Sequence, residues 1–109
     1  MKSHEPSMVI HLTNEIVCVE KCNGYTVATL MGKKQLIMEC SLEIVEKHLP
    51  ANTFARVHKG FLVNIAKIIE IVIKKNSQTI ILTNGRTIPL AKRKKRHLLN
   101  KLRRDSIIV

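Results

Sequence analysis

Two Asn-Gly dipeptides, each lying between short runs of β-prone residues, constrain the fold of this 109-residue chain more than any other feature. Asn23-Gly24 separates residues 16–22 from residues 25–31, and Asn84-Gly85 lies between two similar runs. Asparagine and glycine both tolerate the positive φ that a tight type I′ turn requires. The pattern therefore predicts antiparallel hairpins at both places.

The other β-prone runs are also short, and turns rather than long helices separate them. The expected strands are residues 8–12, 16–22, 25–31, 35–40, 68–74, 78–83 and 86–90, and residues 54–65 are expected to be extended with a break at 58–60. Strands joined in this way favour antiparallel sheets over a parallel sheet. We therefore predict a mainly β fold of small antiparallel sheets, with one short mid-chain helix and a basic C-terminal helix.

The two helices are predicted from capping residues and from the spacing of apolar residues. Ser41 precedes a helical pattern over residues 42–49, and Pro50 ends that pattern. The basic run over residues 92–104 also carries an apolar stripe, which consists of Leu98, Leu99 and Leu102.

The composition is that of one globular domain. Hydrophobic residues make up 45% of the chain and charged residues 25%, which is typical of a folded protein. We expect the domain at residues 8–104, with a leader or linker stub at 1–7 and a short tail at 105–109. No apolar run approaches the ~20 residues of a membrane span. Three cysteines are too few for a disulfide framework, which indicates reduced thiols and a cytoplasmic protein.

The net charge of +11 belongs to the second part of the chain. Residues 1–58 hold six Lys/Arg and six Glu, which cancel, whereas residues 59–104 hold thirteen Lys/Arg and one acid, Glu70. Such an excess of positive charge indicates a polyanionic partner. Nucleic acid is the usual partner of this kind, an anionic membrane surface is the second, and a simply solvated basic face is the remaining interpretation.

The sequence carries no recognisable catalytic or metal-binding pattern. Its five histidines and eight acidic residues form no paired carboxylates and no metal-ligand spacing. The four glycines lie at predicted turns or loops, and none belongs to a phosphate-binding loop. We therefore expect no enzyme activity, no cofactor and no metal.

The scarcity of aromatic residues favours duplex DNA over a single strand. Proteins that bind single strands stack the bases on aromatic rings, yet such residues make up only 3% of this chain. The guanidinium of Arg93 is suited to bidentate contact with guanine in the major groove. The cations around Arg93 are better suited to phosphates; they include Lys92, Lys94 and Arg96.

The segment Arg-Val-His-Lys-Gly-Phe-Leu-Val-Asn at residues 56–64, preceded by Phe54, closely resembles the signature of the LytTR DNA-binding domain. The resemblance extends over about residues 9–102. It includes the segments at residues 16–25, 41–50, 68–73 and 83–95. Several motifs in the same order and at the same spacings make the resemblance specific.

The resemblance implies small antiparallel sheets whose loops, rather than a recognition helix, enter successive major grooves on one face of the duplex. It also implies three DNA-contacting places: the hairpin at Asn23, Gly24 and Tyr25; the loop of His58 and Lys59 with Arg56 nearby; and the segment of Lys92, Lys94 and Arg96 around the base reader Arg93. Members of this family commonly bind paired direct repeats, often behind a receiver domain. A dimer on DNA and a longer chain are both in keeping with it.

The predicted function is sequence-specific binding of double-stranded DNA in a bacterial transcription regulator of two-component type. The first alternative is an RNA-binding module that uses the same basic face. The second is a peripheral membrane or protein-interaction domain, which would bind anionic vesicles and show no sequence preference on DNA.

Overall fold

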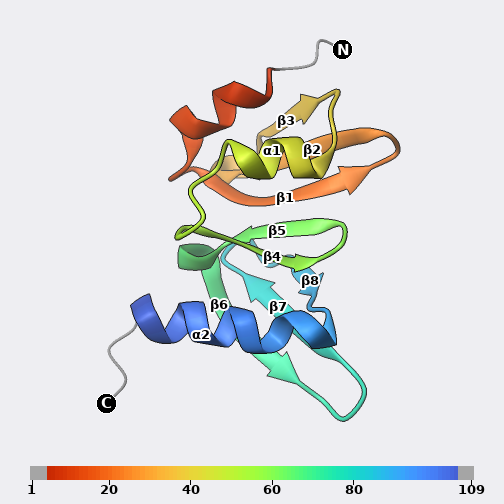
Figure 1. Ribbon diagram of the computed structural model, residues 1–109, viewed down its shortest axis with the longest axis vertical. Coiled ribbons are helices and arrows are strands. Elements are labelled where there is room, and N and C mark those ends of the chain that lie inside the picture. The colour runs from red at the N-terminus through yellow and green to blue at the C-terminus, as the bar shows by residue number, and fades with distance from the viewer. Residues whose placement is uncertain (1–4, 106–109) are drawn as a thin grey trace.

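The computed structural model describes residues 5–105, and their side chains as far as residue 102. This part of the chain forms eight strands in two antiparallel sheets, two α-helices and four short 3-10 helices (Figure 1). The predicted mainly β fold of small antiparallel sheets is confirmed. Most of the predicted leader and tail lies outside the described residues. Of the leader, Glu5 precedes the first helix and residues 6–7 begin it; of the tail, Asp105 ends the last helix.

The larger sheet has five strands in the order β3-β2-β1-β5-β4. Its strands are β1 (Ile16–Cys22), β2 (Tyr25–Leu30), β3 (Gln35–Met38), β4 (Phe54–His58) and β5 (Phe61–Asn64). The first three follow one another as a meander, as predicted. The smaller sheet has the order β6-β7-β8, with strands β6 (Ile68–Ile73), β7 (Gln78–Leu82) and β8 (Thr87–Pro89).

The helices lie around these two sheets. They are η1 (Pro6–Leu12), η2 (Met31–Lys33), α1 (Leu42–Lys47), η3 (Ile65–Lys67), η4 (Lys92–Lys94) and α2 (Lys95–Asp105). The Ser41 hydroxyl accepts a hydrogen bond from the N–H of Ile44 at 3.3 Å, so Ser41 is the predicted N-cap of α1. The basic C-terminal helix is also confirmed, although its first turn, η4, is a separate 3-10 turn.

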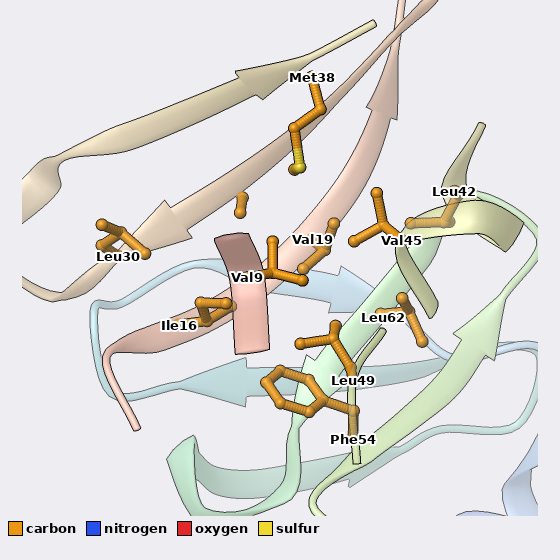
Figure 2. Packing of buried hydrophobic residues seen from close by; sticks show 11 residues of the cluster. Val9, Ile16, Val19, Leu30, Met38, Leu42, Val45, Leu49, Phe54 and Leu62 are labelled. Atoms are coloured by element: carbon orange, nitrogen blue, oxygen red, sulfur yellow. The ribbon is translucent and has the colours of Figure 1, made fainter. Parts of the chain in front are cut away.

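The five-stranded sheet is buried on both faces at β1, β4 and β5. On one face, its strands pack against η1 and α1, and Figure 2 shows Val9, Leu49 and Phe54 among the side chains that fill this core. On the other face, a second core includes Val63, together with residues of the smaller sheet and Leu98 of α2. Burial on both faces holds these three strands rigidly in place.

Residues 8–12 form part of η1, and the prediction of a strand there was wrong. Pro6 stands at the start of η1, where its fixed φ suits a helical turn and its missing N–H costs nothing. Val9 is the fully buried residue of this segment. A short apolar run cannot be assigned to strand or helix by periodicity alone.

Both predicted Asn-Gly hairpins form, but their turns differ. Asn23 and Gly24 have φ values of 46° and 84°, as a type I′ turn requires. At the second hairpin the positive φ of 85° belongs to Gly85. The side chain of Asn84 instead accepts a hydrogen bond from the N–H of Arg86 at 3.0 Å, which stabilises a different turn.

Candidate nucleic-acid interface

The hairpin of β4 and β5 holds the loop of His58, Lys59 and Gly60. Val57 and Leu62, on the two flanking strands, are fully buried and anchor the loop in the core. The His58 Nδ1 atom accepts a hydrogen bond from the N–H of Gly60 at 3.1 Å. Its ring also packs edge-on against Phe61, with 5.6 Å between ring centroids. These contacts fix the backbone of the loop and leave Lys59 exposed.

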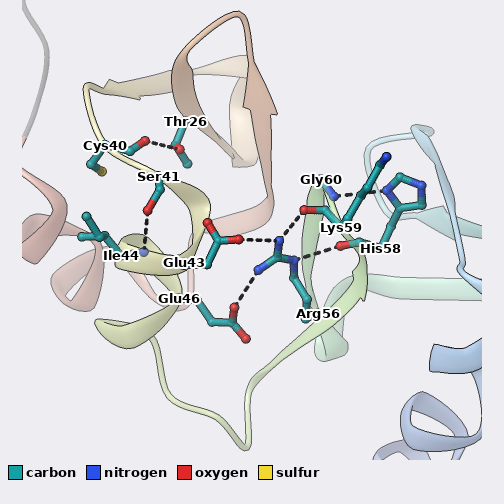
Figure 3. Close-up of polar contacts among 10 residues, drawn as sticks. All are labelled: Thr26, Cys40, Ser41, Glu43, Ile44, Glu46, Arg56, His58, Lys59 and Gly60. Atoms are coloured by element: carbon teal, nitrogen blue, oxygen red, sulfur yellow. Dashed lines mark hydrogen bonds and ion pairs between the residues drawn. The ribbon is translucent and has the colours of Figure 1, made fainter.

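Arg56 uses its guanidinium inside the protein. Its Nε donates to the carbonyl of His58 at 2.9 Å, and Nη2 donates to the carbonyl of Lys59. The same guanidinium forms ion pairs with Glu46 at 2.9 Å and Glu43 at 3.1 Å, both on α1 (Figure 3). The Arg56 side chain is only 15% exposed. Arg56 therefore bridges α1 and the loop, and its contact with DNA stays a prediction.

The bridge affects the titration of Glu43. The pKa of Glu43 is lowered, first by a hydrogen bond from its own backbone N–H and then by the Arg56 side chain. Glu43 is largely exposed, so solvent screens much of this charge interaction.

Two backbone hydrogen bonds tie the other predicted contact places to this hairpin. The N–H of Lys21, close to the Asn23-Gly24 turn, donates to the carbonyl of Gly60 at 3.0 Å. The N–H of Ala91, just before η4, donates to the carbonyl of Val57 at 2.8 Å. In Figure 1 the β1–β2 turn, the β4–β5 turn and the start of α2 therefore lie along one side of the molecule, at the right of the view. The structure brings the three places together.

The turn between β1 and β2 is open to solvent. Asn23 and Gly24 are exposed, and Tyr25 is 43% exposed. Lys21 and Tyr25 line a hollow of about 620 Å³ that reaches to Ser41 at the start of α1. Lys21 is exposed here and was missing from the predicted site. Its position beside an Asn-Gly turn was the signal that could have identified it.

The basic segment is anchored by α2 and exposes its first residues. Lys92, Arg93 and Arg96 are exposed, whereas Lys94 is half-buried beside Arg56. Leu98 is buried in the second core. The Nζ atom of Lys101 donates to the carbonyl of Ala51, in the connection between α1 and β4, at 2.6 Å. It also donates to the carbonyl of Phe54, the first residue of β4, at 2.8 Å.

An ion pair links β1 to the connection between β7 and β8. Arg86 donates to both carboxylate oxygens of Glu20, with N–O distances of 2.5 Å and 3.1 Å. The hydrogen bonds to Glu20 raise the pKa of Arg86. Sequence reasoning missed this pair, because the two residues lie 66 positions apart.

Among the side chains of residues 5–102, no three His, Cys, Asp or Glu gather in a way that could hold a metal ion. None of the helices in that range is both long and apolar enough to cross a membrane.

The sequence profile of the LytTr DNA-binding domain family matches residues 7–103, nearly the whole chain. The chain belongs to this family. The residue-level resemblance to LytTR domains is thereby confirmed, and so is assignment to a class of DNA-binding domain.

Named relatives and a solved structure agree with this family. The chain is 32% identical over 100 residues to the sensory transduction protein LytT of Bacillus cereus and 34% identical over 101 residues to that of Bacillus anthracis. Each alignment covers 91% of this chain but only 40% of the relative. A solved LytTr DNA-binding domain from a putative methyl-accepting/DNA response regulator of Bacillus cereus has the same fold, with a TM-score of 0.74, 21% identity and 84% of each chain covered.

Proposed function

We propose that this LytTR domain binds double-stranded DNA sequence-specifically through loops in the major groove, as part of a bacterial transcription regulator of two-component type in the cytoplasm. The observation that carries the proposal is the placement of three predicted contact segments along one side of the molecule, joined by backbone hydrogen bonds to the β4–β5 hairpin. Rigid loops on a sheet can enter successive grooves without a recognition helix.

The residues of this surface have different proposed roles. Arg93 reads guanine, because its fork matches the O6 and N7 acceptors. The backbone comes closest to the DNA at the turn of Asn23, Gly24 and Tyr25 and at the loop of His58. The exposed cations of the three segments contact phosphates. These cations are Lys21, Lys59, Lys92 and Arg96, with Lys94 at the edge of the set.

The chain spans 40% of the length of its two named relatives, so the larger protein is also a matter of proposal. We propose that the domain acts together with a receiver domain and that two copies occupy paired direct repeats. Selection of bound sites from a pool of random duplex DNA tests sequence specificity directly. Recovery of a repeated motif supports the proposal, whereas recovery of unrelated sequences contradicts it.

A competition experiment addresses the two alternative functions. The selected duplex is challenged with single-stranded RNA of equal length and, separately, with anionic phospholipid vesicles. We expect neither competitor to displace the duplex at equal phosphate concentration. Displacement by the RNA would favour the RNA-binding module, and displacement by vesicles would favour the peripheral membrane domain.

A further inference from the structure

We propose that the open edge of β6 is a self-association surface, on which a second copy of this chain adds its own β6 in antiparallel orientation. β6 is an outer strand of the smaller sheet, and its ladder partner within residues 5–105 is β7. Its six residues are Ile-Ile-Glu-Ile-Val-Ile, with Ile69 64% exposed and Ile73 51% exposed. Long apolar edge strands favour pairing with another chain.

The hydrogen-bonding pattern shows which backbone groups the edge offers. The N–H of Lys74 donates to the carbonyl of Ser77, which makes Lys74 and Ser77 a hydrogen-bonded pair at the β6–β7 turn. Such pairs alternate along an antiparallel ladder, so Val72 and Glu70 bond to β7. The N–H and C=O groups of Ile71 and Ile73 therefore point outward, toward the open edge.

Charge then selects one register for two copies. In a two-fold dimer centred on Val72, Ile71 faces Ile73 of the second copy and exchanges backbone hydrogen bonds with it. In the same register Glu70 faces Lys74 of the second copy, twice by symmetry. Opposite charges directly across a ladder stabilise pairing. Glu70 is also the one acid among residues 59–104. With Glu70 and Lys74 on the same edge, the charges of one copy are opposite to those of a second copy that lies antiparallel to it.

Three neighbouring registers also let the outward N–H and C=O groups of β6 form hydrogen bonds with the second copy. These registers do not place opposite charges across from each other. Centring on Glu70 places the two Glu70 carboxylates opposite each other. Centring on Ile71 places Lys67 opposite Lys75 of the second copy. Centring on Ile73 leaves Glu70 opposite Asn76. Like charges across a ladder are destabilising, so the Val72 register is favoured.

A contact of about five residues per copy is small, and interfaces below about 1,200 Å² are weak or transient. Dimerisation is therefore expected at high protein concentration. The contact uses none of the three proposed DNA-contacting segments, so it does not depend on the proposed function.

Sedimentation equilibrium of the free protein at physiological salt tests the inference by charge exchange. Glu70→Lys and Lys74→Glu each create like-charge contacts and should lower the association constant about tenfold. The double variant Glu70→Lys/Lys74→Glu restores opposite charges and should recover association. Glu15→Lys, an exposed site away from β6, changes the net charge as Glu70→Lys does and should retain more association than Glu70→Lys.

The inference is overturned by a wild-type protein that stays monomeric at all concentrations, by a Glu70→Lys variant that behaves like Glu15→Lys, or by a double variant that fails to recover. Hydrogen exchange at the amides of Ile71 and Ile73 gives an independent readout. We expect exchange to slow as concentration rises. Slow exchange in a monomer would mean that another part of the same protein covers the edge, which also contradicts the proposal.

Discussion

At the scale of single residues, two arginines with the same chemistry have opposite surroundings. Arg56 is only 15% exposed, and its guanidinium donates to two loop carbonyls and two carboxylates. Arg93 is exposed in η4, the short turn before α2. Both residues stand in cationic stretches of sequence. Only the packing of α1 against the β4–β5 hairpin separates the supporting arginine from the exposed one.

Replacing Arg93 with alanine should weaken binding to the selected DNA site by about 1–3 kcal/mol and relax specificity at one base position. The lost bidentate contact is the physical reason. Lys92→Ala is the matched control, because Lys92 is its exposed neighbour and has no fork to read a base. We expect the control to weaken selected and random DNA equally, as measured by fluorescence anisotropy. Equal weakening by Arg93→Ala would reduce Arg93 to a phosphate contact.

Arg56→Ala should lower the free energy of unfolding by about 1.5–3 kcal/mol, because charged hydrogen bonds to the loop carbonyls are lost. DNA affinity should fall through disorder of the loop, while the dependence of log K on log salt stays unchanged. Lys59→Ala is the contrasting variant: it should leave stability nearly unchanged and reduce the salt slope by about one unit. A reduced slope for Arg56→Ala would show that Arg56 itself contacts a phosphate.

At the scale of elements, residue spacing predicted most strands because each strand is short and is ended by a turn residue. The strand predicted at residues 8–12 was wrong because the start of a helix at Pro6 outweighed a short apolar run. The second Asn-Gly hairpin forms as predicted, but there the Asn84 side chain bonds to the backbone and Asn84 does not adopt a positive φ. In both places a local feature determined the conformation, and composition alone does not reveal it. These features are Pro6 at the start of η1 and the hydrogen bond to the Asn84 side chain.

The connection between α1 and the β4–β5 loop should weaken in acid. The pKa of Glu43 lies below its ordinary value of 4.5 in the folded protein, so its contribution to stability is complete above pH 4.5 and is lost as the pH falls through the lowered pKa. NMR signals of the Lys59 and Gly60 amides should therefore shift in that acidic range.

Glu43→Gln provides the control for this titration. It should give, at neutral pH, loop signals that the wild type shows only in acid, because the neutral amide cannot form the ion pair with Arg56. Loop signals that titrate identically in both proteins would contradict a role for Glu43 in holding the loop.

At the scale of the whole molecule, the proposed DNA-contacting side follows the longest dimension. The domain measures 44 × 29 × 24 Å, with its longest axis vertical in Figure 1. A length of 44 Å corresponds to roughly 13 base pairs at about 3.4 Å each. Hydroxyl-radical footprinting of one bound copy should therefore show protection on one face of the duplex over no more than this length. Protection around the full circumference would contradict binding by one row of loops.

Two-fold pairing through β6 gives the two copies opposite directions, whereas copies on direct repeats share one direction. The proposed dimer therefore describes the free protein. Binding to direct repeats would separate the β6 edges.

By itself, the sequence determined the class of fold, the family and the positions of the basic segments. These properties depend on local spacing, turn chemistry and motifs that are contiguous in the chain. Tertiary structure alone decided that Arg56 supports the loop, that Glu20 holds Arg86, and which backbone hydrogen bonds hold the three separate segments along one side. Those outcomes depend on contacts between residues far apart in the chain, such as the bond from Ala91 to Val57, and no local pattern encodes which distant group a donor will reach.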